Sequence, residues 1–298
     1  MRIETLAWTA GSLLAWAGTY LQKYGVSSPR LSAELILGKI LDKSRLELYL
    51  NYDQPLNPEE LAGFKSLLIR RRQHEPVAYI TGVREFYSLE LQVGPGVLIP
   101  RPETELLVDE GLKALADGQE KPRILDLCTG SGAVALALAA NLPQAEIWAA
   151  DISEQALSYA RSNAQKLSLA EVNFIRGDLW SPLLSRGLFF DLITANPPYV
   201  EPGEWEILDP EVRDYEPRLA LLGGGDGFGL IRAILQGARA FLRPLSTLLV
   251  EIASPQAEKA KTEAARAGIY EEISILPDLA GQPRVIKCLR SDYGSASY

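Results

Sequence analysis

The sequence has few of the side chains that bind metal ions or form disulfides. Its 298 residues include one histidine and two cysteines. The single histidine, His74, argues against a histidine-based metal site and against a Ser-His-Asp hydrolase. Cys128 and Cys288 lie far apart, so they give neither a disulfide framework nor the paired spacing of a zinc site. We therefore expect a cytoplasmic protein in a reducing compartment, with no bound metal.

The sequence also lacks long apolar runs and an excess of basic residues. Residues 1–20 are rich in apolar side chains, but Glu4, Thr9 and Ser12 interrupt them, which predicts an amphipathic helix and neither a signal peptide nor a membrane span. The formal net charge of −8 argues against broad binding to a nucleic-acid backbone. With 47% hydrophobic and 23% charged residues, the composition is that of a soluble globular enzyme.

Three regions differ in the spacing of their apolar residues. Apolar residues recur at helical spacing from Ile3 to about Leu68, with helix-start signals at Ser28-Pro29 and Asn57-Pro58, so a small helical bundle is predicted over residues 1–80. Residues 84–93 alternate apolar and polar side chains until Gly94-Pro95-Gly96, which predicts a β-hairpin linker over residues 81–98. In residues 99–298, seven strand-like segments alternate with helical ones. This region is predicted to be an α/β, Rossmann-like domain with a mostly parallel seven-stranded sheet covered on both faces.

A glycine loop near the start of this last region predicts a nucleotide-like ligand. The buried strand 123–127 leads into the small residues 128–132 and then into an alanine-leucine helix. In such a unit the backbone approaches the ligand and offers the amides of the helix N-terminus. The next strand ends in Asp151, about 20 residues beyond the loop, where an acid holds ribose hydroxyls. Asp178, after a third strand, is placed to accept a hydrogen bond from an adenine amino group.

A fourth strand ends in the corner Asn196-Pro197-Pro198-Tyr199. Proline fixes its own φ and keeps the preceding residue extended, so Asn196 is held in place. The Asn196 side-chain oxygen and the main-chain carbonyls of Asn196 and Pro197 then form a cluster of acceptors beside the flat ring of Tyr199. Such a corner suits a planar group that carries an NH₂. A tight β-turn without function is the alternative interpretation of this motif taken alone.

Together these motifs resemble two related groups of enzymes. The pattern Asp126-x-Cys128-x-Gly130-x-Gly132, with the two later acids and the Asn-Pro-Pro-Tyr corner, resembles the S-adenosylmethionine methyltransferases that act on amino groups, including N(6)-adenine DNA enzymes. Further motifs resemble the peptide chain release factor N(5)-glutamine methyltransferases, the HemK/PrmC family, over essentially the whole chain. These motifs are Glu75-Pro76-Val77-Ala78-Tyr79-Ile80-Thr81-Gly82, Glu85-Phe86-Tyr87, Leu98-Ile99-Pro100-Arg101-Pro102-Glu103-Thr104-Glu105 and Tyr215-Glu216-Pro217-Arg218-Leu219-Ala220-Leu221.

The resemblance implies methyl transfer from S-adenosylmethionine to the glutamine amide of the Gly-Gly-Gln loop in class 1 peptide chain release factors, with S-adenosylhomocysteine as product. It also implies that residues 1–80 help to dock this protein substrate. We further expect that residues 81–98 link them to the methyltransferase domain 99–298, and that the protein is a cytoplasmic monomer without direct nucleic-acid or membrane binding. The implied catalytic residues are Asn196, Pro197 and Tyr199. The implied cofactor-binding residues are Asp126, Cys128, Thr129, Gly130, Ser131, Gly132, Asp151, Ile152, Asp178, Leu179 and Asn196. The implied substrate-binding residues are Asn196, Pro197, Pro198, Tyr199, Arg101 and Glu103.

Two positions depart from the family pattern. Cys128 stands where the family usually has glycine, which puts close backbone approach there in question. An aromatic residue commonly follows the second acid, whereas here Leu179 precedes Trp180, so the residue that packs on adenine stays unassigned. Two other functions also stay open: an N(6)-adenine nucleic-acid methyltransferase, against which the acidic charge counts, and a non-catalytic partner-binding protein on a methyltransferase scaffold.

Overall fold

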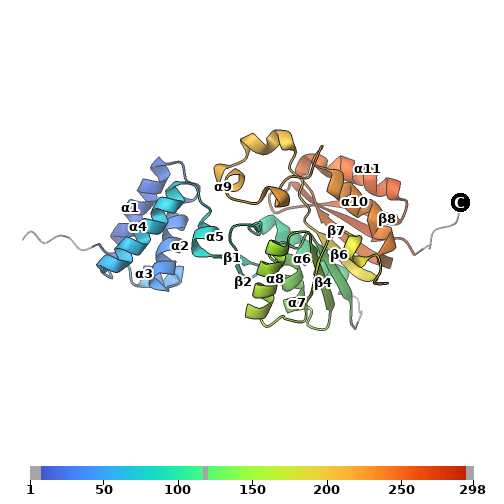
Figure 1. The fold of residues 1–298 in the computed structure, drawn as a ribbon, viewed down its shortest axis with the longest axis horizontal. Coiled ribbons are helices and arrows are strands. Elements are labelled where there is room, and N and C mark those ends of the chain that lie inside the picture. Colours follow the sequence, from blue (N-terminus) through green and yellow to red (C-terminus); the bar gives the residue numbers. More distant parts are fainter. Residues whose placement is uncertain (1–7, 117–119, 293–298) are drawn as a thin grey trace, which may run out of the picture. The chain divides into compact units, whose positions relative to one another are not determined.

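A computed structural model describes residues 8–116 and 120–292, which form two compact units (Figure 1). The first unit extends to Val83 and also includes Asp209–Tyr215. The second unit comprises Arg84–Leu208 and the chain from Glu216 onward. Within the described part of the chain, no helix is both long and apolar enough to cross a membrane.

The first unit is helical, as its apolar spacing predicts. Its sequence-contiguous helices are α1 (Ala10–Lys23), α2 (Pro29–Leu41), α3 (Arg45–Leu50), α4 (Pro58–Arg72) and α5 (Val77–Thr81). Capping boxes at Thr9, Ser44 and Asn57 satisfy the first amides of α1, α3 and α4. The core between the helices is apolar and includes Leu14 and Phe64.

A later segment, which contains the four-residue helix α9 (Pro210–Arg213), packs within this first unit. Glu211 accepts a hydrogen bond of 2.6 Å from the Ser27 hydroxyl and forms an ion pair with Arg71, whose side chain is almost fully buried. The Tyr215 hydroxyl donates to the carbonyl of Gln73 at 2.7 Å. Polar contacts therefore hold this segment in place.

The predicted hairpin is formed by β1 (Val83–Phe86) and β2 (Leu89–Gln92), which pair with each other in a two-stranded sheet. Tyr87 and Ser88 make the turn with φ values of 50° and 61°. Positive φ at both turn residues matches the right-handed twist of the strands that the turn joins.

The second unit contains the predicted seven-stranded sheet, with strand order β5-β4-β3-β6-β7-β9-β8. Strands β3 to β7 run parallel to one another, and β9 runs antiparallel to both β7 and β8. The mostly parallel arrangement confirms the α/β prediction. The strands are β3 (Arg123–Leu127), β4 (Glu146–Asp151), β5 (Asn173–Arg176), β6 (Phe190–Ala195), β7 (Leu242–Glu251), β8 (Tyr270–Pro277) and β9 (Pro283–Arg290).

Helices cover both faces of this sheet (Figure 1). Successive residues of a strand point to opposite faces: Leu125 and Ile193 pack with α10 (Gly229–Gly237) and α11 (Ala257–Ala267), whereas Ile124 and Leu192 pack with the helices of the other face. That face carries α6 (Glu105–Ala114), α7 (Ala133–Asn141) and α8 (Glu154–Lys166). Burial on both faces explains why the central strands β3 and β6 are mostly apolar.

Candidate active site

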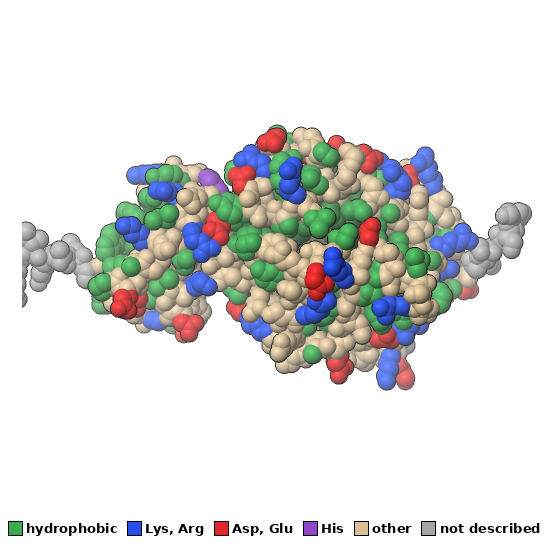
Figure 2. Space-filling view, in the orientation of Figure 1, with side chains coloured by type: hydrophobic (Ala, Val, Ile, Leu, Met, Phe, Trp, Pro, Cys, Tyr) green, Lys and Arg blue, Asp and Glu red, His purple; other side chains and the backbone are tan. Residues whose placement is uncertain are grey.

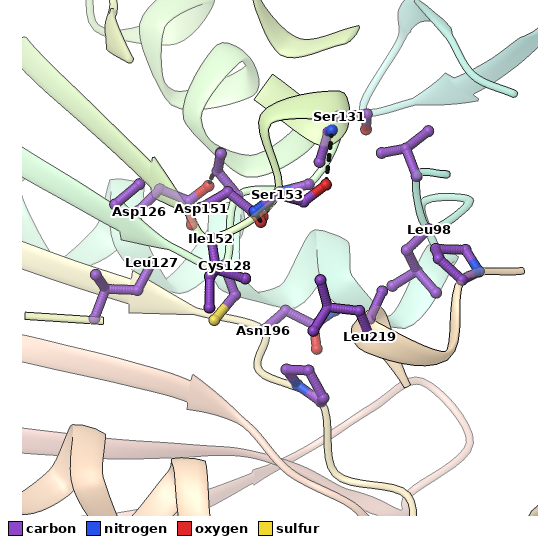
Figure 3. Close-up of a pocket in the computed structure, with 18 of the residues that line it drawn as sticks. Leu98, Asp126, Leu127, Cys128, Ser131, Asp151, Ile152, Ser153, Asn196 and Leu219 are labelled. Atoms are coloured by element: carbon purple, nitrogen blue, oxygen red, sulfur yellow. Dashed lines mark hydrogen bonds between the residues drawn. The ribbon is translucent and has the colours of Figure 1, made fainter. Parts of the chain in front are cut away.

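The candidate site lies where the central strands β3, β4 and β6 end. Leu127 is in register with Ala150 of β4 and with Ala195 of β6, so the three strands end at one edge of the sheet. Cys128, Asp151 and Asn196 stand at or directly after these ends. They line a cavity of about 300 Å³ (Figure 3). This is the edge at which open parallel sheets bind ligands.

Asp126 anchors the glycine loop to the neighbouring strand β6. Its carboxylate accepts hydrogen bonds from the Thr129 hydroxyl at 2.6 Å and from the Thr194 hydroxyl at 2.8 Å, so it joins the loop to β6. Burial raises the pKa of Asp126 to about 6, although both hydroxyls oppose the rise. Its oxygens are thus engaged by the protein, although the residue also lines the cavity.

The loop backbone has a conformation that favours glycine. Cys128, Gly130 and Gly132 have φ values of 56°, 58° and 84°. A Cβ atom at Gly130 would meet no other atom within 4 Å, so the loop is open at this point. Cys128 stands in the left-handed region, which costs a non-glycine residue about 1–2 kcal/mol. Burial raises the pKa of its thiol well above the usual range, so the thiol is neutral.

Asp151 holds two loops together. One carboxylate oxygen accepts from the Gly130 amide at 2.9 Å, and the other accepts from the Ser153 amide at 2.8 Å. Burial raises the pKa of Asp151, and these amides oppose the rise. A carboxylate oxygen accepts more than one hydrogen bond, so Asp151 keeps capacity for ligand hydroxyls in the cavity that it lines.

Leu179 and Trp180, adjacent in the sequence, lie in different places: Leu179 lines the cavity, and Trp180 packs against the core of the sheet. Asp178, Leu179 and Ile152 line the cavity. The Trp180 indole donates to the carbonyl of Ala233 at 3.0 Å and stacks on the ring of Phe241, and it belongs to the core of the sheet. Leu179, which follows Asp178 in the sequence and lines the cavity, is aliphatic, and the aromatic Trp180 packs elsewhere.

Asn196 is oriented by a chain of hydrogen bonds. Its side-chain NH₂ donates to the Thr104 hydroxyl at 3.1 Å, and Thr104 donates to the Glu251 carboxylate at 2.7 Å. Thr104 and Asn196 both line the cavity. Glu251 is only 1% exposed, and burial raises its pKa to about 7. Neither Thr104 nor Glu251 was predicted from the sequence as a site residue.

Arg101, Glu103, Pro197 and Tyr199 are not among the residues that line the cavity. Arg101 forms an ion pair with buried Glu216, which also accepts from the Ile99 amide at 3.1 Å. This contact joins two segments that do line the cavity, one with Leu98 and Pro100 and the other with Pro217, Leu219, Ala220 and Leu222.

The Asn-Pro-Pro-Tyr corner is partly turned into the protein. Pro197 is buried, and the Tyr199 hydroxyl lies 3.5 Å from a Glu251 oxygen. Burial raises the pKa of Tyr199 to about 12, so its hydroxyl stays neutral. Asn196 and Pro198 line the cavity. The substrate-binding roles of Pro197, Tyr199, Arg101 and Glu103 stay predictions.

Comparisons with known proteins agree with this architecture. A family model described as the PrmC N-terminal domain matches residues 12–82, and one described as a methyltransferase domain matches residues 119–276. The N-terminal domain of human METTL16, solved in complex with SAH, is similar in fold, with a TM-score of 0.53, 16% sequence identity, and coverage of 93% of this chain and 95% of that one.

Curated relatives are similar over nearly their whole length. A release factor glutamine methyltransferase from Rhodopirellula baltica is 39% identical, over 94% of this chain and 95% of the relative. One from Moorella thermoacetica is 43% identical, over 90% of this chain and 94% of the relative. The chain therefore belongs to the release factor glutamine methyltransferase family.

Proposed function

We propose that this protein transfers a methyl group from S-adenosylmethionine to the side-chain nitrogen of the glutamine in the Gly-Gly-Gln motif of class 1 peptide chain release factors. The placement of Asn196 supports the proposal most directly: its amide is held at the edge of the ligand cavity by its NH₂ end. Family membership supports the reaction type and the protein substrate. Residues 1–80 would help to dock the release factor to a cytoplasmic, monomeric enzyme.

The lining of the cavity fits the cofactor. Asp151 would accept from the ribose hydroxyls, and Asp178 would accept from the adenine amino group, between the aliphatic side chains of Ile152 and Leu179. The open backbone at Gly130 admits a ligand close to the loop. When bound, S-adenosylmethionine supplies an electrophilic methyl group on a sulfonium. A metal is not needed for this chemistry.

Orientation would be the main contribution of the protein to the rate. An amide nitrogen is a poor nucleophile because its lone pair is delocalised into the carbonyl. Asn196 Oδ1 would accept one N–H of the substrate amide, and the Pro197 carbonyl would accept the other. Alignment of this kind is worth up to about 7–11 kcal/mol in well-oriented systems. The two acceptors would also stabilise positive charge as it grows on nitrogen. The surplus proton leaves the methylated amide readily, so no dedicated base is required.

The surface supports a protein substrate more than a nucleic acid. The formal net charge is −8. On the face shown in Figure 2, Lys and Arg side chains are interspersed with Asp and Glu side chains. A nucleic-acid adenine methyltransferase relies on a basic surface that follows the phosphate backbone.

The test is incubation of a class 1 release factor with this protein and S-adenosylmethionine, followed by mass spectrometry of the Gly-Gly-Gln peptide. We expect one added methyl group on the glutamine. A release factor with the glutamine replaced by alanine is the matched control and should gain none. A parallel incubation with adenine-containing DNA should also stay unmodified. Methyl transfer to DNA without transfer to the release factor would refute the proposal.

A further inference from the structure

Two buried side chains outside the predicted site are linked to Asn196 by hydrogen bonds. Thr104 contacts Asn196 directly, and Glu251 contacts it through Thr104. Thr104 ends the short 3-10 helix η1 (Pro102–Thr104), and Glu251 ends β7. Thr104 is 4% exposed and Glu251 is 1% exposed. Burying such polar groups is costly unless each finds a partner. Thr104 bonds to Glu251 at 2.7 Å and to Asn196 at 3.1 Å, and the Tyr199 hydroxyl also approaches Glu251.

We propose that Thr104 and Glu251 are positioning residues that fix the orientation of the Asn196 carboxamide, so that its Oδ1 is presented to the substrate amide. The inference rests on the proposed function, because it assigns a role to two residues in the same reaction. It concerns the direction of the hydrogen bonds as well as their presence.

The direction follows from counting hydrogens. A threonine hydroxyl has one hydrogen, and an ionised carboxylate only accepts. The Thr104 hydrogen must therefore point to Glu251, which leaves lone pairs of the hydroxyl oxygen facing Asn196. Only the NH₂ end of the Asn196 amide can satisfy those lone pairs. Its oxygen is then directed away from Thr104 and is free to accept from a substrate N–H.

The opposite orientation would oppose the reaction. An Asn196 amide rotated by half a turn would bring its own NH₂ to the place of the acceptor. Two donors would then face each other, and the nitrogen of the substrate would lose its alignment. The carboxylate of Glu251 prevents this through Thr104, without touching the substrate itself.

The ionisation of Glu251 makes this orientation dependent on pH. Burial raises its pKa to about 7, the Thr104 hydroxyl and the charge of Arg284 oppose the rise, and the charge of Glu103 adds to it. The Tyr199 hydroxyl, which lies 3.5 Å from the other carboxylate oxygen, also opposes the rise. A protonated Glu251 is able to donate to Thr104, whose own hydrogen is then free to turn toward Asn196. The fixed direction is therefore present above pH 7 and is lost below it.

The test compares Thr104→Val, which removes the hydroxyl at constant size, with Thr104→Ser, which keeps it. The exposed Thr262 of α11 provides a matched control, Thr262→Val. Steady-state methylation of the release factor gives kcat and KM, and calorimetry gives the affinity for S-adenosylhomocysteine. Loss of one net hydrogen bond predicts a fall in kcat of about ten-fold for Thr104→Val. KM and cofactor affinity should stay unchanged, and Thr104→Ser should recover to within about three-fold of the wild type.

A pH profile supplies a second measurement, which does not depend on Thr104→Val folding well. We expect wild-type kcat to fall below pH 7, whereas Glu251→Gln, which keeps an acceptor oxygen for Thr104 but does not ionise, should show a kcat that does not change between pH 6 and pH 8. Equal kcat for Thr104→Val and wild type, or equal loss for Thr104→Ser and Thr104→Val, would overturn the inference. So would parallel pH profiles for wild type and Glu251→Gln. If the wild type itself fails to methylate the glutamine, the proposed function is refuted first.

Discussion

Replacing Glu251 by glutamine should stabilise the protein at high pH. Burial raises the pKa of this carboxyl from an ordinary value of 4.5 to about 7. In the unfolded chain the group ionises near pH 4.5, whereas in the folded chain it stays protonated until about pH 7. The folded state therefore binds more protons between these values, and the free energy of unfolding falls as pH rises through that window. Each pH unit is worth about 1.4 kcal/mol, so the ionised group costs the folded protein about 3 kcal/mol at pH 8.

Urea denaturation of the wild type and Glu251→Gln at pH 5.5 and pH 8 measures this cost. The variant should be more stable by about 1 kcal/mol at pH 5.5 and by about 3 kcal/mol at pH 8. Glutamine keeps an oxygen that accepts from Thr104, so the hydrogen bond at 2.7 Å is retained. Glu258, which is exposed on α11, provides the control Glu258→Gln, with no such difference between the two pH values. An equal effect of Glu251→Gln at both pH values would refute the reasoning.

Three further substitutions test the loop and the acceptor. Asn196→Ala should lower kcat by about 100-fold or more while leaving calorimetric binding of S-adenosylhomocysteine largely intact, because it removes an acceptor for the reacting amide; undiminished turnover contradicts this role. Asp151→Ala should weaken that binding by about 10-fold or more, because ribose hydroxyls lose a charged acceptor; unchanged affinity contradicts it. Gly132→Ala should lower the free energy of unfolding by about 1–2 kcal/mol, because Gly132 has a positive φ. The loss should exceed that of Gly187→Ala, which also has a positive φ, because a Cβ at Gly132 would lie 3.1 Å from Leu136 and a Cβ at Gly187 would meet no atom within 4 Å. Equal losses in urea denaturation would contradict a steric effect of Leu136.

The strands and their polar ends could be predicted because both follow from local patterns. Continuous apolar runs arise where a strand is buried on two faces, as in β3 and β6. Asp151 and Asn196 stand where such runs stop, and parallel strands end at the same edge. The register of β3 with β4 and β6 brings both residues to one cavity. The same signal existed at Glu251, an acid that ends the apolar run of β7, but its partner was not evident.

That partner depends on contacts far apart in the chain. Thr104 is 147 residues from Glu251 and 92 residues from Asn196. The hydrophobic pattern predicts the type of an element, whereas the strand order decides which strand ends become neighbours. Trp180 is a second case, because its placement on Phe241 depends on the backbone at Leu179, where φ is 43°. Side-chain direction after such a residue is not encoded in apolar spacing.

The segment Asp209–Tyr215 escaped prediction for another reason. It is held in the first unit by polar contacts, chiefly the ion pair between Arg71 and Glu211, and its helix α9 has four residues. A sequence divided into regions by apolar spacing assigns such a segment to the domain on either side of it. The ion pair between buried Arg71 and Glu211 produces no periodic pattern in the sequence that could reveal it.

The three acids of the site, two of them buried and Asp151 partly buried, share a physical role. Asp126 accepts from two hydroxyls, Asp151 accepts from two loop amides, and Glu251 accepts from Thr104. Burial raises the pKa of all three, so each costs the folded protein stability when ionised. In return each acid fixes donors whose direction would otherwise be free. Asp126 and Asp151 hold donors of the glycine loop, Asp151 also holds an amide of the turn after β4, and Glu251 holds the Thr104 hydroxyl beside Asn196. A reaction at a weakly nucleophilic amide gains most from alignment. Acids that orient neutral groups therefore suit this chemistry better than acids that exchange protons with the substrate.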